Sequence, residues 1–103
     1  MEYLKVAELN ECMEGVPRHI EVEGRAVLLV KAEGGLFAVD DTCTHEDASL
    51  AEGFIEGTTI ECPRHGAVFD LQSGKVITAS AVRDLGRYPV RLEGEDVLIG
   101  IEK

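Results

Sequence analysis

Short runs of apolar residues, separated by glycines and charged residues, recur along most of this chain. Residues 19–23 alternate polar and apolar side chains, as expected of a strand in a half-buried sheet. Residues 26–30 are apolar without a break and rich in branched side chains, which favours a buried central strand. The pair Gly34-Gly35 then predicts a tight hairpin turn into a strand over 36–39.

The second half of the chain continues this pattern. We expect further strands over 58–61, 67–70, 90–92 and 97–99, the last two joined by a turn at 93–96. The 3.6-residue period of a helix is nearly absent, apart from short possibilities at 6–12 and 48–51. Many short strands with turn residues between them predict an all-β fold, a small antiparallel β-sandwich or barrel.

Length and composition restrict what else the chain contains. With 103 residues and no linker-like segment, we expect one small domain over 1–103, too short for a carrier module plus a catalytic module. No apolar run approaches the roughly 20 residues that span a bilayer. The N-terminus also lacks the basic start and apolar block of a secretory signal. We therefore expect a cytoplasmic protein without a membrane segment.

The formal charge of the chain is strongly negative. Twenty acidic residues against ten basic ones give a net charge of -10, and the excess is spread along the whole chain. Such a field disfavours binding to nucleic acid and anionic membranes, and favours a partner with a basic docking face. On the sequence alone, the simpler interpretation that the acidity keeps a small protein soluble stays open.

Two of the three cysteines stand in short pairs with histidine. Cys43 precedes His45 by two positions, Cys62 precedes His65 by three, and sixteen residues separate the two pairs. Each pair offers one thiolate and one imidazole from a short loop, so two adjacent loops would supply four metal ligands of two kinds. The third cysteine, Cys12, has no ligand-like neighbour, and we expect it to be a semi-buried structural thiol.

Three interpretations of these four residues compete. Coincidence would require two Cys/His pairs to fall at a suitable interval by chance. A structural zinc site accepts two Cys and two His, but it usually pairs Cys with Cys and His with His. In the third interpretation, each mixed pair contributes to an iron–sulfur cluster with two thiolate and two imidazole ligands.

The pattern Cys-x-His, an interval of sixteen residues and Cys-x-x-His resembles the two cluster loops of Rieske proteins. The resemblance continues in the connecting segment 51–57, in Phe69-Asp70 and residues 73–75, and in residues 88–90. These features look like the small Rieske ferredoxins that serve ring-hydroxylating oxygenases. The resemblance implies a Rieske fold with one [2Fe-2S] cluster, held in a subdomain formed by two loops at about 40–75.

The resemblance also implies a role for each ligand. Cys43 and Cys62 would hold the inner iron, and His45 and His65 the outer iron near the surface. Electrons would pass at the histidine edge, so redox partners would dock near His45 and His65. The implied partners are a flavin reductase and a terminal oxygenase, and the protein would be a one-electron carrier, not an enzyme. We expect it to be a monomer.

Residues beside the ligands predict a reduction potential at the low end of the roughly -150 to +300 mV Rieske range. Respiratory Rieske proteins carry an extra cysteine in each loop, and the two form a disulfide; here Ala48 and Arg64 stand at those positions. They also offer Ser and Tyr hydroxyls to the cluster sulfurs, where this chain has Ala67 and Phe69. Fewer hydrogen bonds leave the reduced cluster less stabilised. The nearby carboxylates of Asp40, Asp41, Glu46 and Asp47 would disfavour reduction further.

Residues 79–85 depart from the family pattern because they contain no proline. Small Rieske ferredoxins usually have a proline-bearing loop there, which covers the cluster, so the shielding of the cluster is left open. Two other functions stay open as well: a small Rieske subunit of a larger oxidoreductase, such as a nitrite-reductase-like enzyme, and a structural zinc-binding module. A hydroxylase is excluded, because only His19 remains for a second iron centre, and we expect His19 to be a solvated strand end.

Overall fold

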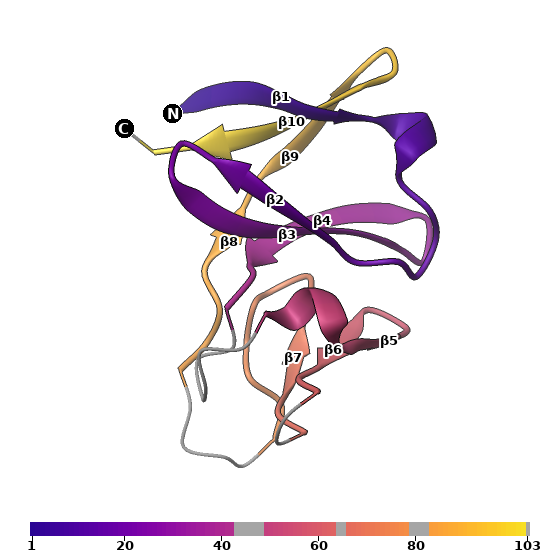
Figure 1. Cartoon of the computed structure of the whole chain (residues 1–103), viewed down its shortest axis with the longest axis vertical. Coiled ribbons are helices and arrows are strands. Elements are labelled where there is room, and N and C mark those ends of the chain that lie inside the picture. The colour runs from indigo at the N-terminus through magenta and orange to yellow at the C-terminus, as the bar shows by residue number, and fades with distance from the viewer. Residues whose placement is uncertain (43–48, 64–65, 79–82, 103) are drawn as a thin grey trace.

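The structure is a computed structural model that describes residues 1–42, 49–63, 66–78 and 83–102. Within these residues the chain forms short strands and two single-turn 3-10 helices (Figure 1). The strands are β1 (Glu2–Glu8), β2 (Arg18–Val22), β3 (Arg25–Ala32), β4 (Gly35–Asp40), β5 (Phe54–Glu56), β6 (Thr59–Glu61), β7 (Val68–Asp70), β8 (Arg87–Tyr88), β9 (Val90–Glu93) and β10 (Asp96–Ile101). The helices are η1 (Leu9–Glu11) and η2 (Leu50–Glu52).

The strands form three antiparallel sheets that lie in three layers. The first sheet has the order β1-β10-β9, the second β2-β3-β4-β8 and the third β5-β6-β7. In Figure 1 the first sheet lies at the top, the second in the middle and the third below. The predicted all-β antiparallel fold is therefore confirmed.

Strand β3 is buried on both of its faces. Leu28 and Val30 belong to a lower core that includes Leu50, Ile60 and Phe69 of the third layer. The alternate residues Val27 and Leu29 belong to an upper core, which includes Val97, Ile99 and Ile101 of β10. Because successive side chains of a strand point to opposite faces, the fully buried stretch 27–30 of β3 needs apolar residues at every position. This explains the unbroken apolar run at 26–30, and the predicted central strand is confirmed.

The turn between β3 and β4 lies one residue earlier than predicted. Glu33 and Gly34 both have positive φ, 51° and 79°, and Ala32 pairs with Gly35. This is the type I′ geometry that matches the twist of a two-stranded hairpin. Gly35 therefore already belongs to β4, and the prediction of a turn at Gly34-Gly35 is wrong by one position.

The helix considered at 6–12 is wrong. Strand β1 continues to Glu8 through its pairing with β10, and only one 3-10 turn follows. This pairing places Ala7 in the upper core, and that burial outweighs a weak helical pattern. Cys12 follows η1 and is buried in the same core, as expected of a structural thiol.

At 48–51, the second helical possibility, the described part contains one 3-10 turn, η2, which Ser49 caps by accepting a hydrogen bond from the Ala51 amide. Strands β1, β5 and β8 were not predicted from the sequence, and β8 has only two residues, too few to show a period. No helix in the described ranges is long and apolar enough to cross a membrane.

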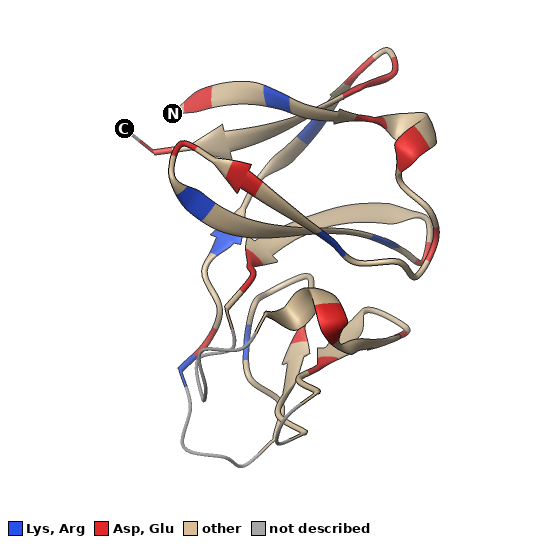
Figure 2. Cartoon of the chain, in the orientation of Figure 1, with Lys and Arg blue, Asp and Glu red and all other residues tan. Residues whose placement is uncertain are grey.

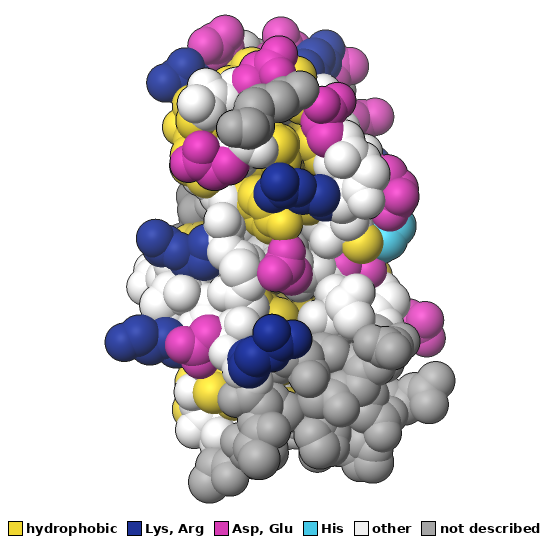
Figure 3. Space-filling model, turned by 90° about the vertical axis from the view of Figure 1, so that its left-hand side faces the viewer, with side chains coloured by type: hydrophobic (Ala, Val, Ile, Leu, Met, Phe, Trp, Pro, Cys, Tyr) yellow, Lys and Arg dark blue, Asp and Glu magenta, His cyan; other side chains and the backbone are white. Residues whose placement is uncertain are grey.

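Acidic side chains are distributed over all three layers. Figure 2 shows them on the turns of the upper layers and on η2 and the strands of the third sheet. Over the face in Figure 3, Lys and Arg side chains alternate with Asp and Glu. On this face the charge is therefore mixed, in agreement with the even spread of acidic residues along the sequence.

The two faces of β3 give a matched test of the three-layer arrangement. Leu28→Ala and Leu29→Ala remove fully buried side chains of equal size from the lower and upper cores, and each should lower the free energy of unfolding by about 2–5 kcal/mol. We expect Leu28→Ala to accelerate amide hydrogen exchange chiefly in β5–β7, and Leu29→Ala chiefly in β9 and β10. Identical exchange patterns for the two variants would contradict the separation into two cores.

Candidate metal centre

Cys62 is the one predicted ligand that the structure describes. Cys43, His45 and His65 lie outside the described residues. Ala48 and Arg64, which stand where respiratory Rieske proteins carry their two disulfide-forming cysteines, lie outside them as well. Among the described residues, no three side chains of the metal-binding types are grouped as a metal site. The flanking residues nevertheless define where each of the two loops begins and ends.

The second loop is the connection between β6 and β7. The Cys62 amide donates a hydrogen bond to the Ala67 carbonyl at 2.8 Å, and the Gly66 amide donates to the Cys62 carbonyl at 3.2 Å. Gly66 has a φ of 74°, in the left-handed region that glycine adopts without strain. Cys62 is 1% exposed and forms no disulfide. The loop therefore begins with a buried free thiol, held by the last hydrogen bonds of a β-hairpin.

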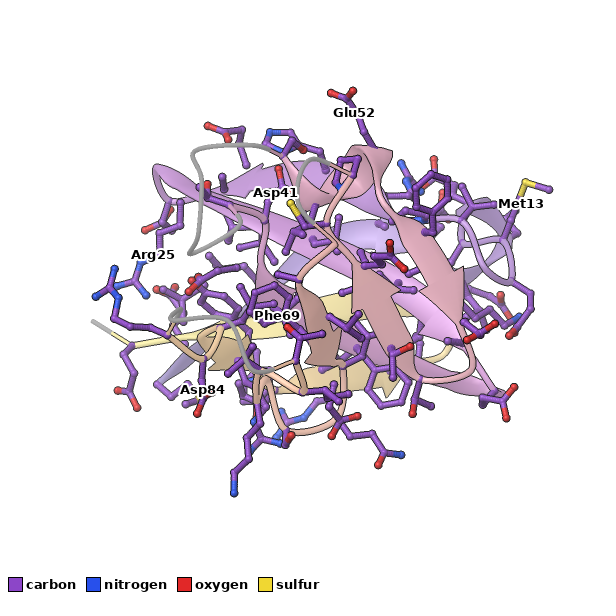
Figure 4. The ribbon with its side chains drawn as sticks, turned by 90° about the horizontal axis from the view of Figure 1, so that it is seen from below. Met13, Arg25, Asp41, Glu52, Phe69 and Asp84 are labelled. Atoms are coloured by element: carbon purple, nitrogen blue, oxygen red, sulfur yellow. The ribbon has the colours of Figure 1, made fainter. Side chains whose placement is uncertain are left out.

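The surroundings of Cys62 are apolar. Ala67 and Phe69 are buried in the same core as Cys62, and Figure 4 shows Phe69 in the interior beneath the middle sheet. Neither side chain has a hydroxyl group. Positions 67 and 69, at which this chain lacks the Ser and Tyr hydroxyl groups of respiratory Rieske proteins, therefore lie in the same buried core as Cys62.

The first loop leaves the end of β4 and returns at η2. Thr42 and Ser49 face each other in an antiparallel bridge, and the Leu50 amide donates to the Asp41 carbonyl at 2.7 Å. Leu50 is fully buried in the core that also contains Cys62. The described ends of the two loops are thus fixed to one core on the same side of the middle sheet.

The carboxylate of Asp41 is a polar centre at the base of the first loop. It accepts hydrogen bonds from the Ser49 hydroxyl at 2.8 Å and from the Ala51 amide at 3.1 Å. The Nδ1 atom of His19, on β2, lies 2.5 Å from the same carboxylate. The hydrogen bond that the His19 imidazole donates to the Asp41 carboxylate raises the pKa of His19 above its ordinary value.

Sequence reasoning missed this arrangement. Asp41 was considered only as a negative charge, and His19 only as a solvated strand end. The His19 side chain is half-exposed, as expected, but it is also hydrogen-bonded to a buried acid. The available signal for a hydrogen bond was an aspartate at the end of a predicted strand. A serine that begins a helical turn follows it eight positions later. The pattern did not reveal that the acid is buried.

The proline-free segment is also fixed at its described ends. On its N-terminal side, the Ile77 amide donates to the Val68 carbonyl at 2.7 Å. On its C-terminal side, Asp84 accepts from the Val76 amide at 2.9 Å, and the Leu85 amide donates to the Gly74 carbonyl at 2.7 Å. Asp84 and Asp41 lie on opposite sides of Phe69 in Figure 4. Residues 79–82 themselves lie outside the described residues, so the structure does not test whether this segment covers the cluster.

Comparison with known proteins places these features in a family. The family model described as "Rieske [2Fe-2S] domain" matches residues 2–89. The ferredoxin component of a naphthalene 1,2-dioxygenase system from Pseudomonas aeruginosa is 36% identical over 100 residues, covering 97% of this chain and 96% of the relative.

Solved structures agree with this similarity along the whole chain. The ferredoxin of carbazole 1,9a-dioxygenase from Nocardioides aromaticivorans IC177 superposes with a TM-score of 0.92 at 28% identity, covering 99% of this chain and 100% of that one. A chain from a complex of reduced oxygenase and oxidized ferredoxin in carbazole 1,9a-dioxygenase gives a TM-score of 0.87 at 31% identity, with 94% and 91% coverage. This chain therefore belongs to the Rieske [2Fe-2S] domain family, and its cofactor is a Rieske-type [2Fe-2S] cluster.

Proposed function

We propose that Cys43, His45, Cys62 and His65 hold the cluster, with the cysteines on the inner iron and the histidines on the outer one. Three observations support this ligand set. Cys62 is a buried thiol outside any disulfide, the described ends of both loops are fixed to one core, and thiolates with imidazoles are the donors that a Rieske cluster takes. We further propose that residues 1–103 act as one Rieske domain with its cluster loops at about 40–75.

The function that these features support best is one-electron transfer from a flavin reductase to the terminal oxygenase of a ring-hydroxylating system. The observation that carries the proposal is the similarity, over 97% of this chain and 96% of the relative, to a dioxygenase ferredoxin component. When bound, the cluster accepts one electron and releases it again. In this proposal the chain is an electron-transfer component and not itself an enzyme.

The described residues contribute a buried, apolar setting for this transfer. Cys62, Ala67 and Phe69 are all at most 1% exposed, so they exclude water from the inner side of the site. A low dielectric without hydroxyl donors destabilises the additional negative charge of the reduced state. The resulting low potential would favour passing the electron on to an oxygenase.

We place partner docking near His45 and His65. The Ile77 side chain is 56% exposed, and the Ile77 amide donates a hydrogen bond to the carbonyl of Val68, at the beginning of β7. An exposed apolar side chain that a partner could contact therefore lies beside the second loop. The net charge of -10 would favour a partner with a basic docking face. We propose that the carrier acts as a monomer in the cytoplasm.

The first test identifies the metal and its ligands. The purified protein should be red-brown, should contain two iron atoms per chain, as a [2Fe-2S] cluster requires, and should give a Rieske EPR signal on reduction. Cys62→Ser and Cys43→Ser should remove most of the iron, because each loses a thiolate ligand. Cys12→Ser, a change of the same type at another buried cysteine, should retain it. A colourless protein with stoichiometric zinc would overturn the proposal.

The second test addresses the potential. Ala67→Ser should raise the reduction potential by roughly 30–60 mV, because a hydroxyl donor stabilises the reduced state more than the oxidised one. Ala32→Ser introduces the same group into the same core, but on β3, and should leave the potential unchanged. Equal shifts measured by redox titration in both variants would argue against a specific hydrogen bond at position 67.

The third test concerns docking. Ile77→Asp should lower the second-order rate of electron transfer to a ring-hydroxylating oxygenase by about tenfold. The variant loses an apolar contact and must bury a carboxylate at the interface, and this desolvation cost outweighs the attraction of one more acidic residue for a basic partner face. Leu92→Asp adds the same charge at an exposed leucine of β9, in the first sheet, and should leave the rate nearly unchanged. Stopped-flow mixing of the reduced variants with oxidised oxygenase measures both rates. A larger effect at Leu92 would move the docking surface away from the cluster loops.

A further inference from the structure

The end of β4 carries two adjacent carboxylates with different partners. The Asp40 side chain accepts from the Tyr88 hydroxyl at 2.6 Å and from the Gly86 amide at 2.9 Å, so it holds the chain where it returns to β8. Asp41 instead contacts residues beyond the first loop. Asp41 directly follows β4, and its contacts with Ser49 and Ala51 place its carboxylate on the side of the lower core.

Asp41 is the one buried charged residue in the part of the chain that the structure describes, at 2% exposure. Burial of a carboxylate is costly unless hydrogen bonds replace its water. Here three donors do so: the Ser49 hydroxyl, the Ala51 amide and His19. A buried carboxylate that depends on three specific donors indicates a local structural requirement that an apolar residue would not meet.

The positions of these donors define that requirement. Ser49 and Ala51 follow residues 43–48 by one and three positions, whereas Asp41 precedes them by two. The backbone carbonyl of Asp41 also accepts from the Leu50 amide. One residue thus joins the entry of the first loop to its exit, through its side chain and its backbone together. His19 connects the same carboxylate to β2, at the edge of the middle sheet.

We propose that Asp41 is a positioning residue for the first cluster loop: by joining the residues that flank positions 43–48 to one another and to His19 of β2, it sets where Cys43 and His45 stand relative to Cys62. The inference rests on the proposed ligand set. Its physical basis is that fixing the ends of a short loop restricts the conformations of the residues between them. Ligands held by such outer contacts bind their metal more tightly than ligands on a free loop.

The experiment compares variants that remove the same contacts in different ways. Asp41→Asn keeps the size of the side chain but places an amide group against three donors, and Ser49→Ala removes one donor while keeping the charge. Asp40→Asn is the matched control, because it changes the charge equally one residue away and leaves the contacts of Asp41 intact. Leu29→Ala is the control for general destabilisation, because it affects the upper core and none of these groups.

The readouts are iron release to a chelator in native buffer, the EPR spectrum of the reduced protein and amide hydrogen exchange. We expect Asp41→Asn to release iron about tenfold faster than the unmodified protein, with broadened EPR lines and faster exchange at Leu50 and Ala51. Ser49→Ala should change each quantity in the same direction but less. Asp40→Asn and Leu29→Ala should release iron at less than about twice the original rate.

Each outcome decides between defined alternatives. If Leu29→Ala releases iron as fast as Asp41→Asn, general stability explains the effect and the positioning role is overturned. If Asp40→Asn matches Asp41→Asn, charge alone explains it, with the same consequence. If Asp41→Asn does not fold, Ser49→Ala decides. An unmodified protein without a cluster would refute the proposed function, whereas a loaded protein whose Asp41 and Ser49 variants retain iron normally would refute only this inference.

Discussion

The burial of β3 on both faces is the constraint on which the rest of the structure depends. This strand contributes Val27 and Leu29 to the upper core and Leu28 and Val30 to the lower core, so the middle sheet lies between the two cores and packs against both. The third sheet has strands of only three residues each, too short to be stable by themselves. Their stability depends on packing against the lower face of the middle sheet, so the position of Cys62, which follows β6, depends on that sheet as well.

Polar contacts complete what the apolar packing begins. The lower core fixes Leu50 and Cys62, but the chain must still leave the core to form the loops. At each such point a carboxylate or a backbone amide accepts or donates a hydrogen bond: Asp41 at the first loop, Cys62 and Ala67 at the second, and Asp84 beside residues 79–82. Buried apolar contacts supply most of the stability, and these few directional bonds define where the loops begin.

The parts of the fold that could be predicted are those that produce a regular pattern of apolar and polar residues along the sequence. An apolar run at 26–30 indicates two buried faces, and both cores confirm it. The ligand set of the two mixed Cys/His pairs stays a prediction, because Cys62 is its one described member. Strand β8 could not be predicted, since two residues carry no period and its pairing with β4 depends on distant chain. The burial of Asp41 could not be predicted either, because a sequence does not show which of two adjacent acids faces a core. Positions 6–12 were mistaken for a helix because their pattern ignores the pairing partner, β10.

The pairing of β4 with β8 has a consequence for the history of the molecule. Val39 pairs with Arg87 and Ala38 with Tyr88, so the chain departs from the middle sheet and rejoins it at neighbouring strands. The chain that connects β4 to β8 therefore leaves and rejoins the middle sheet at two junctions that lie side by side. Loops within such a segment can change in length while Leu50, Ile60 and Phe69 continue to cover the lower face of β3. Evolution could therefore vary the surface seen by redox partners without rebuilding the scaffold beneath it.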